Sequence, residues 1–167
     1  LSQNYPFHPI VDAWKARSRD LFPQDDQQAR EQVMEIDAKV LSNRKPPYGI
    51  TGGLFDAMVD TDGEMVFMTN KEAAEAARLF EEEEGIDIHP AAAVATASLI
   101  QAVQNKIVSP DAVVMLNITG GGEKRLKREK GELTYLKPSL VISPDVTIRE
   151  LEEKLHFIPS TRVFGTT

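Results

Sequence analysis

Residues 112–118 constrain the fold more than any other part of this 167-residue chain. They read Ala-Val-Val-Met-Leu-Asn-Ile, a largely apolar run without the strict alternation of a half-buried strand. Such runs are typical of strands covered on both faces, which occur mainly in parallel sheets flanked by helices. The sequence therefore predicts a central strand at 112–118 in a mostly parallel sheet.

The segments on either side alternate between helix and strand patterns. Pro9 opens an amphipathic helix pattern whose apolar positions reach Leu21, and residues 24–38 form either a helix or a surface excursion. Strands are expected at 63–68 and at 139–143. This alternation indicates an α/β protein.

Terminal residues mark the boundaries of three further helices. Thr69 and Glu72 match a capping box, and Gly85 is placed to end the helix that follows it. Pro90 suits the first position of an alanine-rich helix, and residues 147–150 form a second capping box.

Composition excludes several classes of protein. With 41% hydrophobic and 27% charged residues the chain suits one globular domain rather than a disordered segment. The net charge of −7 argues against a nucleic-acid partner, and no run reaches the roughly 20 apolar residues of a membrane span. The absence of cysteine fits a reducing cytoplasm. The start Leu1-Ser2-Gln3-Asn4, without an initiator Met, indicates a piece of a longer protein.

The best candidate for a binding site is the turn Thr119-Gly120-Gly121-Gly122, directly after the expected central strand. Ligands of parallel sheets bind at the carboxyl ends of the strands. Three glycines let a backbone or a planar ligand approach closely, and Thr119 brings a hydroxyl group. The same residues also suit a plain strand-to-helix turn. The three histidines fit no metal motif, and His89 before Pro90 is interpreted as structural.

Four stretches together resemble the threonine-synthase-like family of pyridoxal-phosphate (PLP) enzymes. They are Pro9-Ile10-Val11-Asp12-Ala13, Met65 to Glu72, Gly85 to Ala93 and Leu116 to Lys124. The triple glycine followed by Glu123-Lys124-Arg125 is more similar to the archaeal cysteate synthases of that family than to threonine synthases. The resemblance implies the tryptophan-synthase-β-like PLP-enzyme fold.

The resemblance also implies roles for individual residues. Thr119 would pair with the pyridine nitrogen of PLP, with Gly120, Gly121 and Gly122 beside the ring. Lys124 and Asn4 are candidates for substrate contact, and no metal ligand is expected. The Schiff-base lysine and the phosphate cradle belong to the N-terminal half of such enzymes, and neither motif is found here. Residues 1–167 are therefore expected to be one domain, the C-terminal part of a two-domain enzyme, inactive alone.

The function implied is a β-replacement that converts O-phosphoserine and sulfite to cysteate and phosphate, for coenzyme M biosynthesis. The expected partners are these substrates, the N-terminal part of the same enzyme and a possible second subunit, but neither nucleic acid nor membrane. Two alternatives stay open. One is a threonine synthase acting on O-phosphohomoserine and water, and the other is a non-catalytic α/β module whose Thr119–Gly122 turn holds a phosphate.

Overall fold

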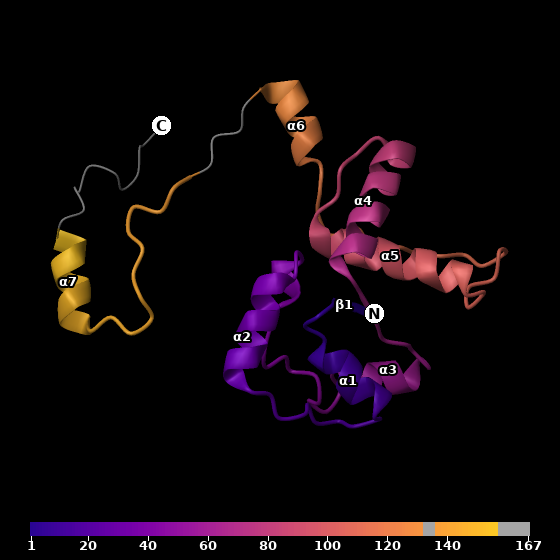
Figure 1. Cartoon of the computed structure of the whole chain (residues 1–167), viewed down its shortest axis with the longest axis horizontal. Coiled ribbons are helices and arrows are strands. Elements are labelled where there is room, and N and C mark those ends of the chain that lie inside the picture. Colours follow the sequence, from indigo (N-terminus) through magenta and orange to yellow (C-terminus); the bar gives the residue numbers. More distant parts are fainter. Residues whose placement is uncertain (132–135, 157–167) are drawn as a thin grey trace. The chain divides into compact units, whose positions relative to one another are not determined.

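A computed structural model describes residues 1–131 and 136–156, which fall in two units, Leu1–Gly131 and Glu132–Thr167 (Figure 1). The first unit contains, in chain order, β1 (Ser2–Asn4), α1 (Pro9–Lys15), α2 (Asp26–Glu35), the 3-10 helix η1 (Lys39–Leu41), α3 (Leu54–Asp60), β2 (Val66–Met68), α4 (Asn70–Glu84), α5 (Pro90–Gln104) and α6 (Glu123–Lys130). The second contains α7 (Ile148–His156). Helices combined with a parallel strand pair confirm the α/β class. That residues 1–167 form one domain stays a prediction.

The sheet consists of β1 and β2, which pair in parallel with Ser2 opposite Val66 and Asn4 opposite Met68. β2 lies inside the strand expected at 63–68, whereas the sequence analysis did not anticipate β1. Three helices and η1 fill the long connection between the two strands, as parallel pairing requires.

Helix α1 is positioned by β1 and is shorter than its apolar pattern indicated. The Gln3 side-chain oxygen accepts hydrogen bonds from the backbone N–H groups of Ile10 and Val11, at 2.9 and 3.0 Å, and so satisfies the start of the helix. The helix ends at Lys15 because Arg17 adopts a left-handed conformation with φ 53°. The expectation that the helix reaches Leu21 was wrong.

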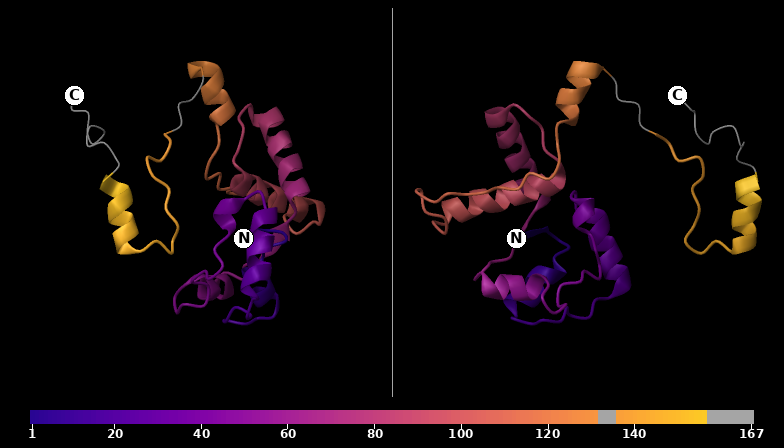
Figure 2. Two further views of the ribbon diagram at one scale, coloured as in Figure 1. Left: turned by 60° about the vertical axis from the view of Figure 1, so that its left-hand side comes forward. Right: turned by 180° about the vertical axis from the view of Figure 1, so that it is seen from behind.

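Helices α4 and α5 pack against each other (Figure 2). Their contact surface is lined by buried alanines, namely Ala73 and Ala76 of α4 and Ala92, Ala93 and Ala97 of α5. The expected capping box is present, with the Thr69 hydroxyl accepting from the Glu72 N–H at 3.2 Å. Gly85 ends α4 at φ 71° and Pro90 opens α5, as predicted.

A second apolar cluster lies around α1 and α3. Trp14, the single tryptophan, is 2% exposed and packs edge-on against Phe55. Its indole N–H donates to a Glu64 carboxylate oxygen at 3.2 Å. Its fluorescence therefore reports specifically on the Leu1–Gly131 unit.

The strand expected at 112–118 is absent from the structure. These residues pair with no strand among the described residues, and Val113 and Met115 are almost fully exposed. An apolar pattern indicates that a segment is buried. A central strand also needs a hydrogen-bonded strand on each side, and the described residues supply none here. The strand expected at 139–143 is absent for the same reason.

In the Glu132–Thr167 unit, α7 starts where its capping box placed it. The Thr147 hydroxyl accepts from the Glu150 N–H at 3.3 Å, and the Glu150 carboxylate accepts from the Thr147 N–H at 2.9 Å.

Replacing the cap of α4 tests how far this helix supports its unit. Thr69→Ala removes an acceptor for a helix-end N–H and should lower the free energy of unfolding by about 1 kcal/mol. Urea unfolding followed by Trp14 fluorescence measures it. Thr147→Ala is the matched control, because it removes the same cap from α7 in the other unit and should leave the Trp14 transition unchanged. If both variants lowered the free energy of unfolding in the Trp14 transition equally, each cap would not act within its own unit alone.

Candidate functional site

The turn Thr119–Gly122 is fixed to the segment that precedes α5. The His89 N–H donates to the Gly120 carbonyl at 2.9 Å, and the Gly122 N–H donates to the Asp87 carbonyl at 2.7 Å. Between these bonds, Ile88 and Gly121 form an isolated antiparallel bridge. Two segments more than thirty residues apart are thus joined at one point.

The glycines of the turn allow this contact. A Cβ on Gly121 would collide with the Asp87 carbonyl and lie 2.7 Å from the Ile88 Cα, so a side chain would separate the segments. Gly122 is the N-cap of α6 and adopts φ 85°, a left-handed conformation that glycine takes without strain. A Cβ on Gly120 would lie 2.7 Å from His89 Nδ1. Each glycine therefore has a structural role in the turn.

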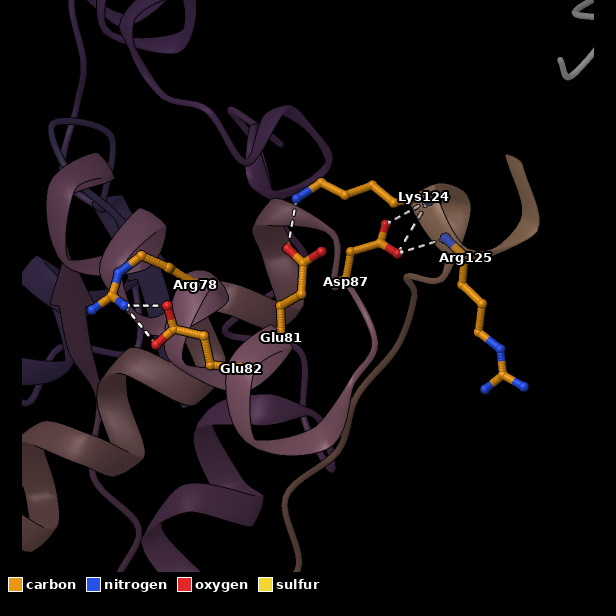
Figure 3. A network of polar contacts seen from close by, with 6 residues as sticks. All are labelled: Arg78, Glu81, Glu82, Asp87, Lys124 and Arg125. Atoms are coloured by element: carbon orange, nitrogen blue, oxygen red, sulfur yellow. Dashed lines mark hydrogen bonds and ion pairs between the residues drawn. The ribbon is translucent and has the colours of Figure 1, made fainter. Parts of the chain in front are cut away.

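The Asp87 carboxylate caps α6. It accepts hydrogen bonds from the Lys124 N–H at 3.1 Å to both oxygens and from the Arg125 N–H at 3.4 Å (Figure 3). Burial acts to raise the pKa of this carboxyl group. The N–H donors of Lys124, Arg125 and Asp87 itself, together with the charge of Lys124, outweigh burial, so the pKa of Asp87 lies below its ordinary value. Asp87 therefore holds the start of α6 in its ionised form.

The Lys124 side chain adds a second link across the same junction. Its Nζ lies 2.6 Å from Glu81 Oε2, at the end of α4 (Figure 3). This hydrogen bond and the Glu81 charge raise the pKa of Lys124, which therefore stays protonated. Of the acidic run 81–84, Glu81 is thus paired with Lys124, and Glu82 is paired with Arg78 at 2.5 Å. The substrate contact of Lys124 stays a prediction, and in this conformation its ammonium group is paired.

Thr119 is exposed and borders two cavities. The smaller, of about 290 Å³, is lined by Thr119 and Gly120, by residues 37–40 and by His89–Ala91 at the start of α5. The larger, of about 520 Å³, lies between α5 and residues 114–117. The hydroxyl that the sequence analysis singled out is therefore free to meet a ligand.

His89 has more contact with the site than the sequence indicated. Its ring lies against Gly120 and lines the smaller cavity, with Nε2 3.5 Å from Glu123 Oε1. Both side chains are half exposed. Its position before Pro90 gave no sign of this, because the contact with the turn is formed only by the tertiary fold.

Asn4 is fully buried and has a structural role. Its amide donates to the Met68 carbonyl and to Asn70 Oδ1, each at 3.0 Å, and its oxygen accepts from the Ala38 N–H at 3.0 Å. Both amide hydrogens are thus used inside the protein. Contact between Asn4 and a substrate stays a prediction.

Among residues 1–131 and 136–156, no helix is both long and apolar enough to cross a membrane. Within the same residues, no cluster of three or more His, Asp or Glu side chains is arranged to hold a metal ion.

The fold and the site define an α/β protein with a glycine-rich turn locked to the start of a helix. No family model matches the chain. The chain is 49% identical over 154 residues to the cysteate synthase of Methanosarcina barkeri and 51% identical over 154 residues to that of Methanosarcina mazei. It is 45% identical over 159 residues to that of Methanocella paludicola. These alignments cover 91–94% of the chain.

The chain spans 37% of the length of these relatives, and the matched stretch is their C-terminal part. The chain is therefore similar to the C-terminal part of the cysteate synthases. This confirms the resemblance drawn from the sequence. The individual site residues stay predictions, because similarity over the chain as a whole does not assign roles to them.

Removing the Asp87 carboxylate tests the link on which the turn depends. Asp87→Ala should speed hydrogen exchange at the Lys124 and Arg125 amides at pH 7, measured by NMR. The folded pKa of Asp87 lies below the ordinary value of about 3.9, so the carboxylate stabilises the fold above that pH. The difference between variant and wild type should therefore shrink as the pH falls below about 4.

The matched control is Asp111→Ala, which alters an exposed aspartate outside this network. It should leave both amides unchanged. Exchange that is as slow in Asp87→Ala as in wild type at pH 7 would contradict the capping role.

Proposed function

We propose that this chain is the C-terminal part of a PLP-dependent enzyme that converts O-phosphoserine and sulfite to cysteate and phosphate. The observation that carries the proposal is the 40–51% identity to proteins named cysteate synthase, over an alignment that includes most of the chain. The exposed Thr119 hydroxyl on a glycine turn gives the proposal a chemical site. The finer fold assignment, the tryptophan-synthase-β-like PLP fold, is part of the same proposal.

The residues present fit one side of the cofactor. Thr119 offers a hydroxyl donor at a cavity of about 290 Å³, and Gly120 leaves no side chain on the wall next to it. PLP, when bound, supplies an electron sink for substrate carbanions. The Schiff-base lysine and the phosphate cradle would come from the N-terminal part of the same enzyme.

The type of ring partner favours β-replacement. A neutral Thr119 hydroxyl that donates to the pyridine nitrogen does not enforce protonation of that nitrogen, as a carboxylate would. The Thr119 hydroxyl would in this way favour loss of phosphate and addition of sulfite at the β-carbon over transamination. The turn keeps the hydroxyl in place, because Gly120 and Gly122 are hydrogen-bonded to His89 and Asp87.

The proposal assigns Lys124 to attraction of the anionic substrates. Its ammonium group is charged and lies in the first turn of α6, but it contacts Glu81 in this conformation. An anion would have to exchange for that carboxylate. Assembly into a homo-oligomer and a cytoplasmic location remain predictions of the same proposal.

An assay of the full-length enzyme tests the reaction. Phosphate release from O-phosphoserine should depend on sulfite and yield cysteate in equal amount, and this chain alone should give none. Release from O-phosphohomoserine in water would favour threonine synthesis instead. No turnover of either substrate, with PLP bound, would favour the non-catalytic module.

A substitution tests the cofactor contact separately from turnover. In the full-length apoenzyme, Thr119→Ala should raise the dissociation constant of PLP about tenfold to a hundredfold, because a buried ring nitrogen loses its donor at a cost of about 1–3 kcal/mol. Thr119→Ser should largely preserve binding.

The matched control is Thr61→Ala, since the Thr61 hydroxyl donates to the Ala57 carbonyl at the end of α3 and lines neither cavity. Equal PLP affinity in Thr119→Ala and wild type would remove Thr119 from the cofactor site.

A further inference from the structure

Exposure alternates along residues 115–118, as it does in a strand, although these residues form none. Val113 and Met115 are 103% and 94% exposed. Leu116 and Ile118 are partly buried, and Ile118 packs on the core around α5. The segment thus packs on the protein at Leu116 and Ile118, while Val113, Val114 and Met115 form an outer face of large apolar side chains.

The backbone of this segment is also unpaired. Within residues 1–131 and 136–156, the N–H groups of residues 113–119 donate no hydrogen bond to another backbone group. β1 and β2 pair only with each other within the same part of the chain, so each has an open edge. Extended apolar backbone with free N–H and C=O groups is a template for an added strand.

An apolar groove runs along the segment. Its volume is about 520 Å³, and it is lined by Ala95, Leu99 and Ala102 of α5, by Val66 of β2 and by residues 114–117. Leu1 and Ser2 line the same groove. Polypeptide that precedes Leu1 would therefore enter at the groove without a long connection.

We propose that this groove and the outer face of residues 113–117 are the docking surface for the polypeptide that precedes Leu1 in the full-length enzyme. An extended segment of that polypeptide pairs with the backbone of residues 113–117 and covers Val113 and Met115. The proposal rests on the proposed function only in taking this chain as the C-terminal part of a longer protein. Most of the length of the relatives lies outside the matched stretch, and polypeptide of this kind would occupy the docking surface.

The position of Leu1 favours this occupant over a second copy of the chain. A preceding segment is tethered at the groove, so its effective concentration there is high. Two copies, each with a net charge of −7, would instead have to associate against their mutual repulsion.

The five methionines of the chain provide the test, because mild peroxide oxidises exposed methionines fastest. Met34 is 76% exposed on α2 and is the exposed reference, and Met68, 1% exposed, is the buried one. Oxidation of each is followed by mass spectrometry in this chain alone and in the full-length enzyme, with N-acetylmethionine amide as an internal standard.

In this chain alone, Met115 should oxidise as fast as Met34. In the full-length enzyme its rate should fall by at least about tenfold towards that of Met68, while Met34 keeps its rate. Equal rates for Met115 and Met34 in the full-length enzyme would overturn the proposal. Protection of Met115 that already appears in the chain alone and grows with its concentration would also overturn it, in favour of a second copy.

A pair of variants in the full-length enzyme gives an independent measurement. Met115→Lys should lower the thermal midpoint, because it places a charge at a covered position, whereas Met34→Lys should leave it unchanged. Neither the oxidation rates nor the midpoints depend on turnover. These measurements therefore test the docking surface independently of whether the enzyme makes cysteate.

Discussion

The Asp87 carboxylate is the interaction on which the arrangement of the candidate site depends. It lies between α4 and α5 in the chain and caps α6, so it joins three helices at one point. The Gly122 N–H donates to the carbonyl of the same residue. These bonds hold the Thr119–Gly122 turn against the segment that precedes α5. Exposed ion pairs such as Lys124–Glu81 add little stability in comparison, although they contribute to the same junction.

Local signals predicted the parts of the fold that are decided locally. Thr69, Gly85 and Pro90 each satisfy or terminate a helix end within a few residues, so their patterns could be read from the sequence. The end of α1 could not, because a left-handed Arg17 overrides a continuing apolar pattern. β1 is only three residues long and depends on a partner more than sixty positions away.

The candidate site shows the same division. Thr119 and its glycines could be singled out because a glycine run after an apolar segment is a local pattern. Asp87 and His89 could not, since both act on residues more than thirty positions further along the chain. The apolar run at 112–118 predicts a buried strand, and in this chain it is exposed apart from Leu116 and Ile118, which are partly buried. The apolar pattern indicates that the segment needs neighbouring strands to cover it, and the described residues supply none. The chain spans only 37% of the length of its relatives.

Under the proposed function, these features would form one part of a shared site. This chain would contribute the Thr119–Gly122 turn and a hydroxyl group, while the lysine and the phosphate cradle would come from elsewhere in the same enzyme. In such a site the position of the turn would matter, because a cofactor held by two parts of a protein tolerates little displacement of either part.

A crystal structure of the full-length enzyme with PLP bound tests this account most directly. The account predicts the Thr119 Oγ1 within hydrogen-bonding distance of the pyridine nitrogen, with the Asp87 carboxylate still accepting from the Lys124 and Arg125 N–H groups. A cofactor ring bound away from the turn, with Thr119 facing solvent, would contradict it.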